Sequence, residues 1–394
     1  MLRQNKLFTI IIMMLLFFAA SVSLNDALNP ISLYVALPAA FVISFMHECK
    51  VKVNVYLGIL FLLYCWVLVV TPFSVNIENS AEQLKQILGC ILLCYVFASQ
   101  AKNPKLIMWL YLLYVVLYVG TMDYAINNIM SVMDKIGGRE RVGDQKLNAN
   151  TLAYYTFFLT FSVFILGEII QNKWLKKVFN WGFFLVIPLS LWISIITASR
   201  QVLLLQVPLV TVLIYLRYVK FGNWKTILLL SCLVVCMIIY FYDYIMLQYG
   251  ESYLAERSQR SFTEDSRFVL IKESVALGLD HMFVGVGPSC VRLFTYEKAF
   301  SHNTFLELWA GTGLVGMLIF IYLVYLFFKR QIKRYKHTKD KMFLYFLVFG
   351  CFFLLDQMFY VFYASLWLIG FFILVASHSE TYFNYKYKDL KQIK

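Results

Sequence analysis

The chain has 394 residues, of which 61% are apolar, 18% are aromatic and 14% are charged, and its mean hydropathy is +0.70. A soluble globular domain carries about a quarter charged residues, so this composition excludes one and indicates an integral membrane protein. The formal net charge of +13 follows from the distribution of loop charges described below and does not indicate a nucleic-acid partner.

Apolar runs of spanning or near-spanning length recur along the whole chain. We expect the first to be a retained span and not a cleaved signal peptide, because no small-x-small cleavage site precedes a soluble chain. In the last run Asp356 and Gln357 separate two short helices, and we expect Asp356 to mark a loop. The expected spans are 7–24, 31–46, 55–75, 86–99, 106–122, 151–170, 179–197, 201–217, 226–244, 303–328 and two within 342–376. This pattern predicts an all-α polytopic membrane protein with about twelve transmembrane helices in a single domain, 1–394.

The loop charges predict which way the spans face. Sorted by alternate loops, 23 Lys and Arg lie on one side and 12 on the other, and ten of those 12 lie in two long loops that are exempt from the short-loop rule. We therefore expect both termini to be cytoplasmic, with the basic run 329–341 attracted to anionic lipid. The two long outer loops are expected at 123–150 and 245–302. Apolar residues at helical spacing predict a surface helix near 264–277 in the larger, periplasmic loop.

Several common chemistries find no support in the sequence. GTGLVG, from Gly311 to Gly316, matches G-x-G-x-x-G but lies in an expected span with no strand before it, so a dinucleotide site is excluded. Ala310, Gly313 and Gly316 are instead expected to let helices pack closely. No Walker A sequence or zinc-ligand spacing occurs. No metal or cofactor is therefore expected. Most of the eight cysteines fall in apolar runs, so no structural disulfide is expected either.

Arginines expected on the outer side are more informative. Arg200 is the sole charge between Phe179 and Leu216, and an arginine at such depth usually faces a polar cavity, although it can also snorkel at the end of a span. Four further arginines among those expected on the same side are candidates, and each taken singly also fits an ordinary loop charge. Together these guanidinium groups suit a lipid-linked phosphate or diphosphate, which they bind in a bidentate way. The four are Arg139, Arg141, Arg267 and Arg292.

His302 and Asn303 stand where a polar segment runs into the apolar run 303–328, whose one charge is Glu307. We expect both residues at the boundary between lipid and water. Histidine, with a reference pKa of about 6.5, can accept a proton from a sugar hydroxyl near neutral pH. The alternative is a histidine at a helix start that only hydrogen-bonds a loop.

Three separated stretches resemble one family, the O-antigen polymerase and O-antigen ligase superfamily of bacterial membrane glycosyltransferases. They are R-x-G…N-x-N at Arg141, Gly143, Asn148 and Asn150; Ser199-Arg200 at the opening of a span; and SRFVLIKESVALGLDHMFVGVGP followed by SHNTFLELWAGTGLVG. The resemblance covers roughly 140 to 330. It implies about twelve helices with a large periplasmic loop, similar to type C glycosyltransferases, in the bacterial cytoplasmic (inner) membrane with the active site on the periplasmic face.

The resemblance also implies a reaction. The donor would be a glycan on undecaprenyl diphosphate, Arg200 and Arg267 would bind the diphosphate, and His302 would activate the acceptor hydroxyl for an inverting, metal-independent transfer. The family's Ser-Arg-Gly is Ser-Arg-Gln here, which affects how closely the diphosphate approaches the backbone. Further candidate substrate contacts are Arg139, Arg141, Asn150, Arg292 and Asn303.

The acceptor stays open at this point. We expect a polymerase of surface polysaccharide, working on a lipid-linked repeat unit, with membrane lipid around it and a chain-length regulator as a further partner. The alternative is a ligase that transfers the glycan to lipid A core or to a protein hydroxyl. An alternative of another class is a non-enzymatic transporter of lipid-linked glycan, which would show ionisable residues at mid-membrane and broken helices.

Overall fold

The computed structural model describes residues 2–22, 29–48, 54–119, 149–197, 200–218, 266–296, 298–361 and 365–387. Every regular element in this part of the chain is a helix. The chain forms two compact units, the first from Met1–Leu113 and Phe262–Lys394 and the second from Tyr114–Ser261. The expected span 226–244 lies outside the described residues.

Four of the described helices are long and apolar enough to cross a membrane by length and composition: Val55–Phe73, Ile77–Gln100, Thr304–Thr338 and Leu366–Lys386. Shorter apolar helices cover Lys6–Val22, Ser32–Met46, Pro104–Val119, Tyr155–Ile169 and Leu205–Tyr218. The protein is thus an α-helical membrane protein. The count of twelve spans stays a prediction.

The first unit contains α1 (Leu2–Val22), α2 (Asn29–Ile31), η1 (Ser32–Ala36), α3 (Leu37–Glu48), α4 (Val55–Val70), η2 (Thr71–Phe73), α5 (Ile77–Gln100), α13 (Ser266–Asp280), η4 (Val291–Leu293), α14 (Thr304–Thr338), α15 (Lys341–Gln357) and α16 (Leu366–Lys386). The second contains α7 (Ala149–Ile169), α8 (Lys173–Thr197) and α9 (Arg200–Tyr218). The helix expected over 264–277 is α13.

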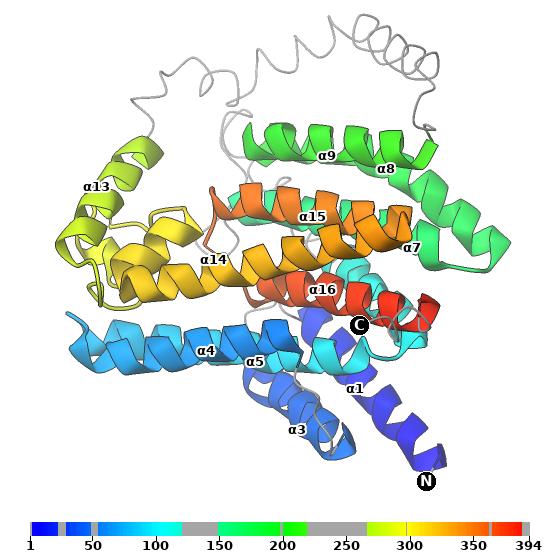
Figure 1. Cartoon of the computed structure of the whole chain (residues 1–394), viewed down its shortest axis with the longest axis horizontal. Helices are drawn as coiled ribbons and strands as arrows, with labels where there is room; N and C mark the ends of the chain where they lie inside the picture. Colours follow the sequence, from blue (N-terminus) through cyan, green and yellow to red (C-terminus); the bar gives the residue numbers. More distant parts are fainter. Residues whose placement is uncertain are drawn as a thin grey trace, which may run out of the picture. The chain divides into compact units, whose positions relative to one another are not determined.

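Helix α14 is broken at Gly313. Gly313 has φ 75° and ψ 177°, a conformation that essentially only glycine adopts. The ring centroids of Phe305 and Phe320 lie 5.6 Å apart, whereas residues so far apart in a straight helix are separated by about 22 Å. The segment before the break therefore folds back along the segment after it (Figure 1). The expected uninterrupted helix from Asn303 to Phe328 is corrected to a short arm, 304–312, and a long arm, 314–338.

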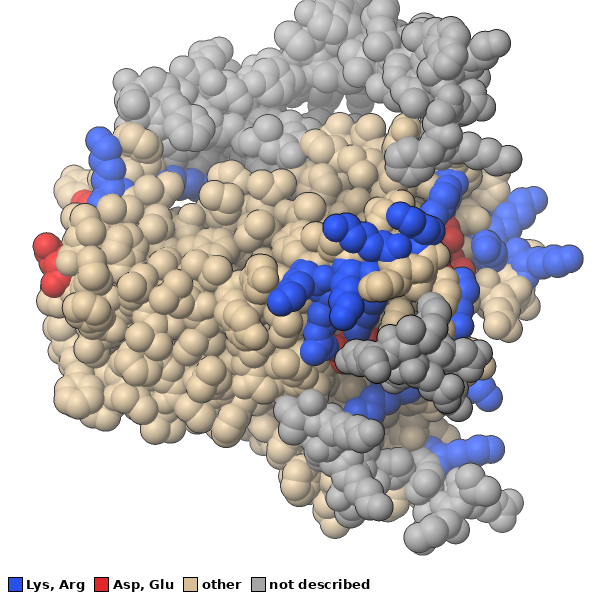
Figure 2. Space-filling model, viewed as in Figure 1, with Lys and Arg blue, Asp and Glu red and all other residues tan. Residues whose placement is uncertain are grey.

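The long arm packs against α4, α15 and α16. Phe327 lies 6.3 Å from Tyr56 of α4, 6.3 Å from Phe349 of α15 and 5.1 Å from Phe372 of α16 between ring centroids. Beyond this aromatic core the arm ends in the basic run 329–341, called here the basic end, where Lys and Arg side chains gather (Figure 2). The other end of the long arm is the turn at Gly313.

The division of the last apolar run falls where Asp356 and Gln357 predicted it, because α15 ends at Gln357 and α16 begins at Leu366. The expectation that Asp356 marks a loop is wrong. Asp356 lies in the last turn of α15 and is buried. A carboxyl group at that place is tolerated because the Gln357 side chain donates a hydrogen bond to it, from Nε2 to Oδ2, at 3.2 Å.

In the second unit α7, α8 and α9 follow one another and pack together. Arg217 near the end of α9 donates from Nε to Glu168 near the end of α7, at 2.6 Å. Further along the two helices the buried Gln206 side chain donates to Thr160. Helices α7 and α9 therefore run in the same direction. Such polar pairs join helices that have little hydrophobic reason to associate in lipid.

Candidate functional site

His302 lies in the loop before α14, and hydrogen bonds of the adjacent residues Ser301 and Asn303 fix the backbone of this loop. The Asn303 side chain caps the short arm by accepting from the backbone N–H groups of Phe305 and Leu306, at 3.0 and 3.1 Å. The buried Glu307 carboxylate accepts from the backbone N–H of Ser301 at 2.9 Å. His302 itself is half-buried and has φ 52°, a left-handed conformation. The predicted role of Asn303 as the helix start is confirmed.

A second loop closes the turn of α14 through backbone hydrogen bonds alone. Val286 N–H donates to Ala310 and Gly287 N–H to Gly311, both at 2.9 Å, and Leu314 N–H donates to Met282 at 2.7 Å. We call these paired segments, 282–287 and 310–314, the backbone latch. The latch satisfies backbone groups that the break in α14 would otherwise leave without partners.

The glycines of the latch permit this approach. A Cβ at Gly313 would overlap the carbonyl group of Phe283, and one at Gly285, whose φ is 73°, would overlap the backbone of Gly311. The expectation that Gly313 packs against another helix is therefore corrected, because it packs against a loop. Gly316 does face a helix, since a Cβ there would lie 3.3 Å from the Trp66 ring of α4.

The fold-back sets how far His302 lies from the turn. Because Phe305 contacts Phe320, the start of the short arm lies about 10 Å along the long arm from Gly313. His302 directly precedes that start. It therefore lies beside the long arm, and its expected place at the boundary between lipid and water stays a prediction.

The end of α15 anchors the same loop, which the sequence did not reveal. The Thr304 hydroxyl donates to Gln357 Oε1 at 2.9 Å or to the carbonyl of Tyr360 at 2.8 Å. Asn303 Nδ2 donates to the carbonyl of Met358 at 3.3 Å. The only sequence signal was the polar pair Asp356-Gln357 in an apolar run. Its use is to hold the residues that follow His302.

Replacing Gln357 by leucine is expected to lower activity by about 10-fold to 100-fold, because small displacements of a reacting group have effects of this size. The change removes the contact with Thr304 and the hydrogen bond to Asp356, and it leaves the backbone contacts at Met358 and Tyr360. The rate of glycan transfer measures it. The matched control is Gln100→Leu, since Gln100 is a buried glutamine that bonds Ser44 on another helix. Equal losses in both variants would contradict a positioning role for Gln357.

Two of the predicted arginines lie in the first unit. Arg267 is in the first turn of α13, and its side chain is half-buried. Helix α13 packs on the short arm, where a Cβ at Gly278 would contact the Trp309 ring at 2.8 Å. Arg292 lies in η4, donates from Nη2 to Asn79 Oδ1 at 3.1 Å and lies 5.8 Å from the Phe300 ring. Arg292 thus lies beside Phe300 in the loop that carries His302, whereas Arg267 lies on α13 eleven residues before the contact of Gly278 with the short arm.

The second unit carries two further predicted residues. Arg200 is the first residue of α9, and Asn150 lies in the first turn of α7. Since α7 and α9 run in the same direction, Arg200 and Asn150 lie at the same end of this unit, opposite Glu168 and Arg217. Arg139 and Arg141 lie outside the described residues. Within the part that the structure describes, no three His, Cys, Asp or Glu side chains are grouped as metal ligands.

One family model matches a part of the chain that contains several of these residues. Residues 183–321 match the model of the family described as O-antigen ligase, so the match includes Arg200, Arg267, Arg292, His302 and the latch. Members of this family are glycosyltransferase-like membrane enzymes. No curated protein is significantly similar to the chain. The match supports an O-antigen ligase- or polymerase-type membrane enzyme without separating the two. Residues 183–321 therefore match the O-antigen polymerase and ligase superfamily, the family that the sequence motifs indicated.

Proposed function

We propose that the protein is a polymerase of surface polysaccharide, such as O-antigen, capsule or exopolysaccharide. It transfers a glycan from undecaprenyl diphosphate to a lipid-linked repeat unit. The observation that carries this proposal is the half-buried His302, held between the capped short arm and the end of α15, inside the segment that matches the family.

The proposed chemistry uses one base and several cations. His302 accepts the proton of an acceptor sugar hydroxyl while its oxygen attacks the anomeric carbon of the donor. The bond from that carbon to the diphosphate breaks, and undecaprenyl diphosphate leaves with the bonding electrons. Arg200 and Arg267 neutralise its charge, and attack opposite the leaving group inverts the anomeric centre. No metal is required in this scheme, because a diphosphate is already a good leaving group.

The surroundings of His302 suit transfer to a sugar instead of to water. Ser301 is 1% exposed and Asn303 9%, and the Thr304 hydroxyl is bonded within the protein. Irregular backbone beside a span is tolerated only where protein covers it or where it lines a water-filled cavity. Protein around the reacting hydroxyl excludes water and so limits hydrolysis of the donor.

We further propose the arrangement in the membrane that the loop charges indicate: about twelve spans in the bacterial cytoplasmic membrane, both termini in the cytoplasm and His302 accessible from the periplasm. Arg139, Arg141, Asn150, Arg292 and Asn303 then serve as further substrate contacts. A chain-length regulator is the proposed protein partner.

A ligase is the second candidate, because the description of the matched family names an O-antigen ligase and the match does not separate ligase from polymerase. The glycans of a strain that lacks the gene separate the two. We expect surface lipid capped with single repeats, because a lost polymerase still leaves ligation working. Full-length chains that accumulate on undecaprenyl diphosphate would contradict the polymerase and indicate the ligase.

The break in α14 also bears on the transporter alternative, since broken helices are a feature of transporters. Here the latch holds the broken segment through three backbone hydrogen bonds, and the break brings the short arm to the end of α15. This fixed arrangement favours a positioned catalytic loop over a moving gate.

A further inference from the structure

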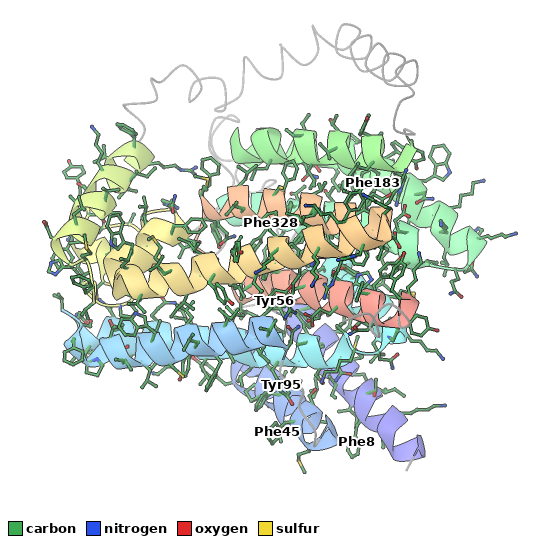
Figure 3. The ribbon with its side chains drawn as sticks, in the orientation of Figure 1. Phe8, Phe45, Tyr56, Tyr95, Phe183 and Phe328 are labelled. Carbon is green, nitrogen blue, oxygen red and sulfur yellow. The ribbon has the colours of Figure 1, made fainter. Side chains whose placement is uncertain are left out.

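Two helices of the first unit share a group of polar side chains at the basic end. We call it the arginine cluster: Arg330, Gln331 and Arg334 of α14 with Ser379 and Glu380 of α16. Arg330 Nη1 contacts Glu380 Oε1, and Arg334 Nη2 lies 3.7 Å from the same oxygen. Arg330 also lies 5.4 Å from the ring of Tyr56 on α4, which Figure 3 labels. Two guanidinium groups thus share a single carboxylate.

The cluster holds more hydrogen-bond donors than acceptors. Arg334 Nη1 donates to Ser379 Oγ at 2.9 Å, and Ser379 Oγ donates to Gln331 Oε1 at 2.5 Å. Gln331 is 0% exposed, and its Nε2 has no hydrogen-bond partner among the described residues. A buried donor without a partner is costly, so its presence beside two arginines indicates a missing acceptor.

Among the described residues of this end, the other acidic group does not supply that acceptor. Asp340, between α14 and α15, accepts hydrogen bonds from Lys386, Tyr382 and Tyr387 at 2.7 to 2.9 Å. Burial alone would raise the pKa of Asp340, but these bonds and the backbone N–H of Met342 lower it below its ordinary value. Its charge is therefore already matched, and the excess positive charge in the arginine cluster remains.

We propose that the arginine cluster is a binding site for the phosphate group of an anionic phospholipid. A phosphate accepts several charged hydrogen bonds at once, which matches two guanidinium groups and the Gln331 amide. The side chains of Arg330, Arg334 and Glu380 are 35%, 13% and 22% exposed, so the cluster is reached from its edge while its base is buried. We take the occupant to be a lipid because the cluster lies where the apolar residues of the long arm give way to the basic run 329–341. A helix of this kind meets lipid head groups at that point.

This site differs from general attraction of the basic run to the membrane. Lys329, Lys333 and Lys336 on the same arm are exposed and attract any anionic surface. The arginine cluster instead offers donors of α14 that contacts with Ser379 and Glu380 of α16 hold in place. It is also separate from the proposed transfer chemistry, since Arg330 lies about 15 Å along the long arm from Phe320, beside which the short arm starts. The proposal therefore does not depend on the proposed function.

Thermal unfolding of the purified full chain in mixed micelles tests the proposal, with phosphatidylglycerol titrated against phosphatidylcholine. Wild-type protein is expected to gain stability with phosphatidylglycerol in a saturable way. Arg334→Gln and Gln331→Met are expected to need at least about tenfold more of this lipid for half the effect, because each loses hydrogen bonds to a charged group. Inorganic phosphate should not replace the lipid.

The variant Glu380→Gln distinguishes a lipid-binding site from a clamp, by which we mean a set of contacts that only joins α14 to α16. It removes the competing carboxylate, so a lipid site should bind phosphatidylglycerol more tightly. A clamp would lose stability with no gain in affinity. The surface control Lys333→Gln with Lys336→Gln should leave half-saturation unchanged. Lipid dependence that follows the lysines and not Arg334, Gln331 and Glu380, or that inorganic phosphate reproduces, would overturn the proposal.

Discussion

His302→Ala is expected to yield an inserted protein that makes no long-chain glycan. Loss of a general base lowers rates by about 100-fold to 10,000-fold, which is enough to remove polymer from a cellular glycan profile. Because His302 has φ 52°, alanine there also carries backbone strain. His302→Asn avoids this difficulty, since asparagine tolerates a left-handed backbone, and it should be equally inactive.

The control for this prediction is His337→Ala, which removes an exposed histidine at the basic end. Its glycan profile should match that of the wild type. Normal long chains from both His302 variants would show that the imidazole takes no part in transfer, and the alternative of a histidine that only supports a loop would then hold.

Gly313→Ala is expected to abolish activity by undoing the fold-back of α14. The φ of 75° and ψ of 177° at Gly313 are essentially closed to alanine, and the added Cβ would overlap the Phe283 carbonyl. A straighter α14 would carry the short arm away from Gln357 and would leave latch groups without partners. Membrane insertion should persist, because the long arm stays apolar. Gly89→Ala is the matched control, since a Cβ there meets nothing within 4 Å.

Chemical cross-linking measures the fold-back itself. Phe305→Cys with Phe320→Cys, in a background without the other cysteines, should be joined by a short thiol-reactive linker, because the two rings lie 5.6 Å apart. Mass spectrometry of the linked peptides detects the product. Addition of Gly313→Ala should remove it. A cross-link that survives this change would contradict the role assigned to Gly313.

The helices could be predicted from the sequence because apolar runs of sufficient length leave few alternatives in lipid. The start of α14 at Asn303 and the division at Gln357 also followed from local residue chemistry. The break at Gly313 could not be predicted this way. Its φ depends on a loop some thirty positions earlier docking its backbone onto 310–314, and small residues in an apolar run usually indicate helix packing.

The sequence was enough to predict which residue types form the candidate site, but not how these residues are arranged in space. Guanidinium groups and an imidazole indicated phosphate binding and proton transfer, and the family match covers Arg200, Arg267 and His302. The anchoring of His302 by the end of α15 required the fold, because Gln357 and Thr304 are far apart in the chain. Asp356 was misjudged because its burial and its hydrogen bond with the adjacent Gln357 are seen only in the packed helix.

The most direct test of the central claim uses the purified full chain with undecaprenyl-diphosphate-linked oligosaccharide and no added metal or nucleotide. We predict longer lipid-linked glycan and one undecaprenyl diphosphate released for each transfer, with neither product from His302→Asn. Failure of the wild-type protein to elongate the glycan, together with movement of intact lipid-linked glycan across reconstituted vesicles, would contradict the account and indicate a transporter.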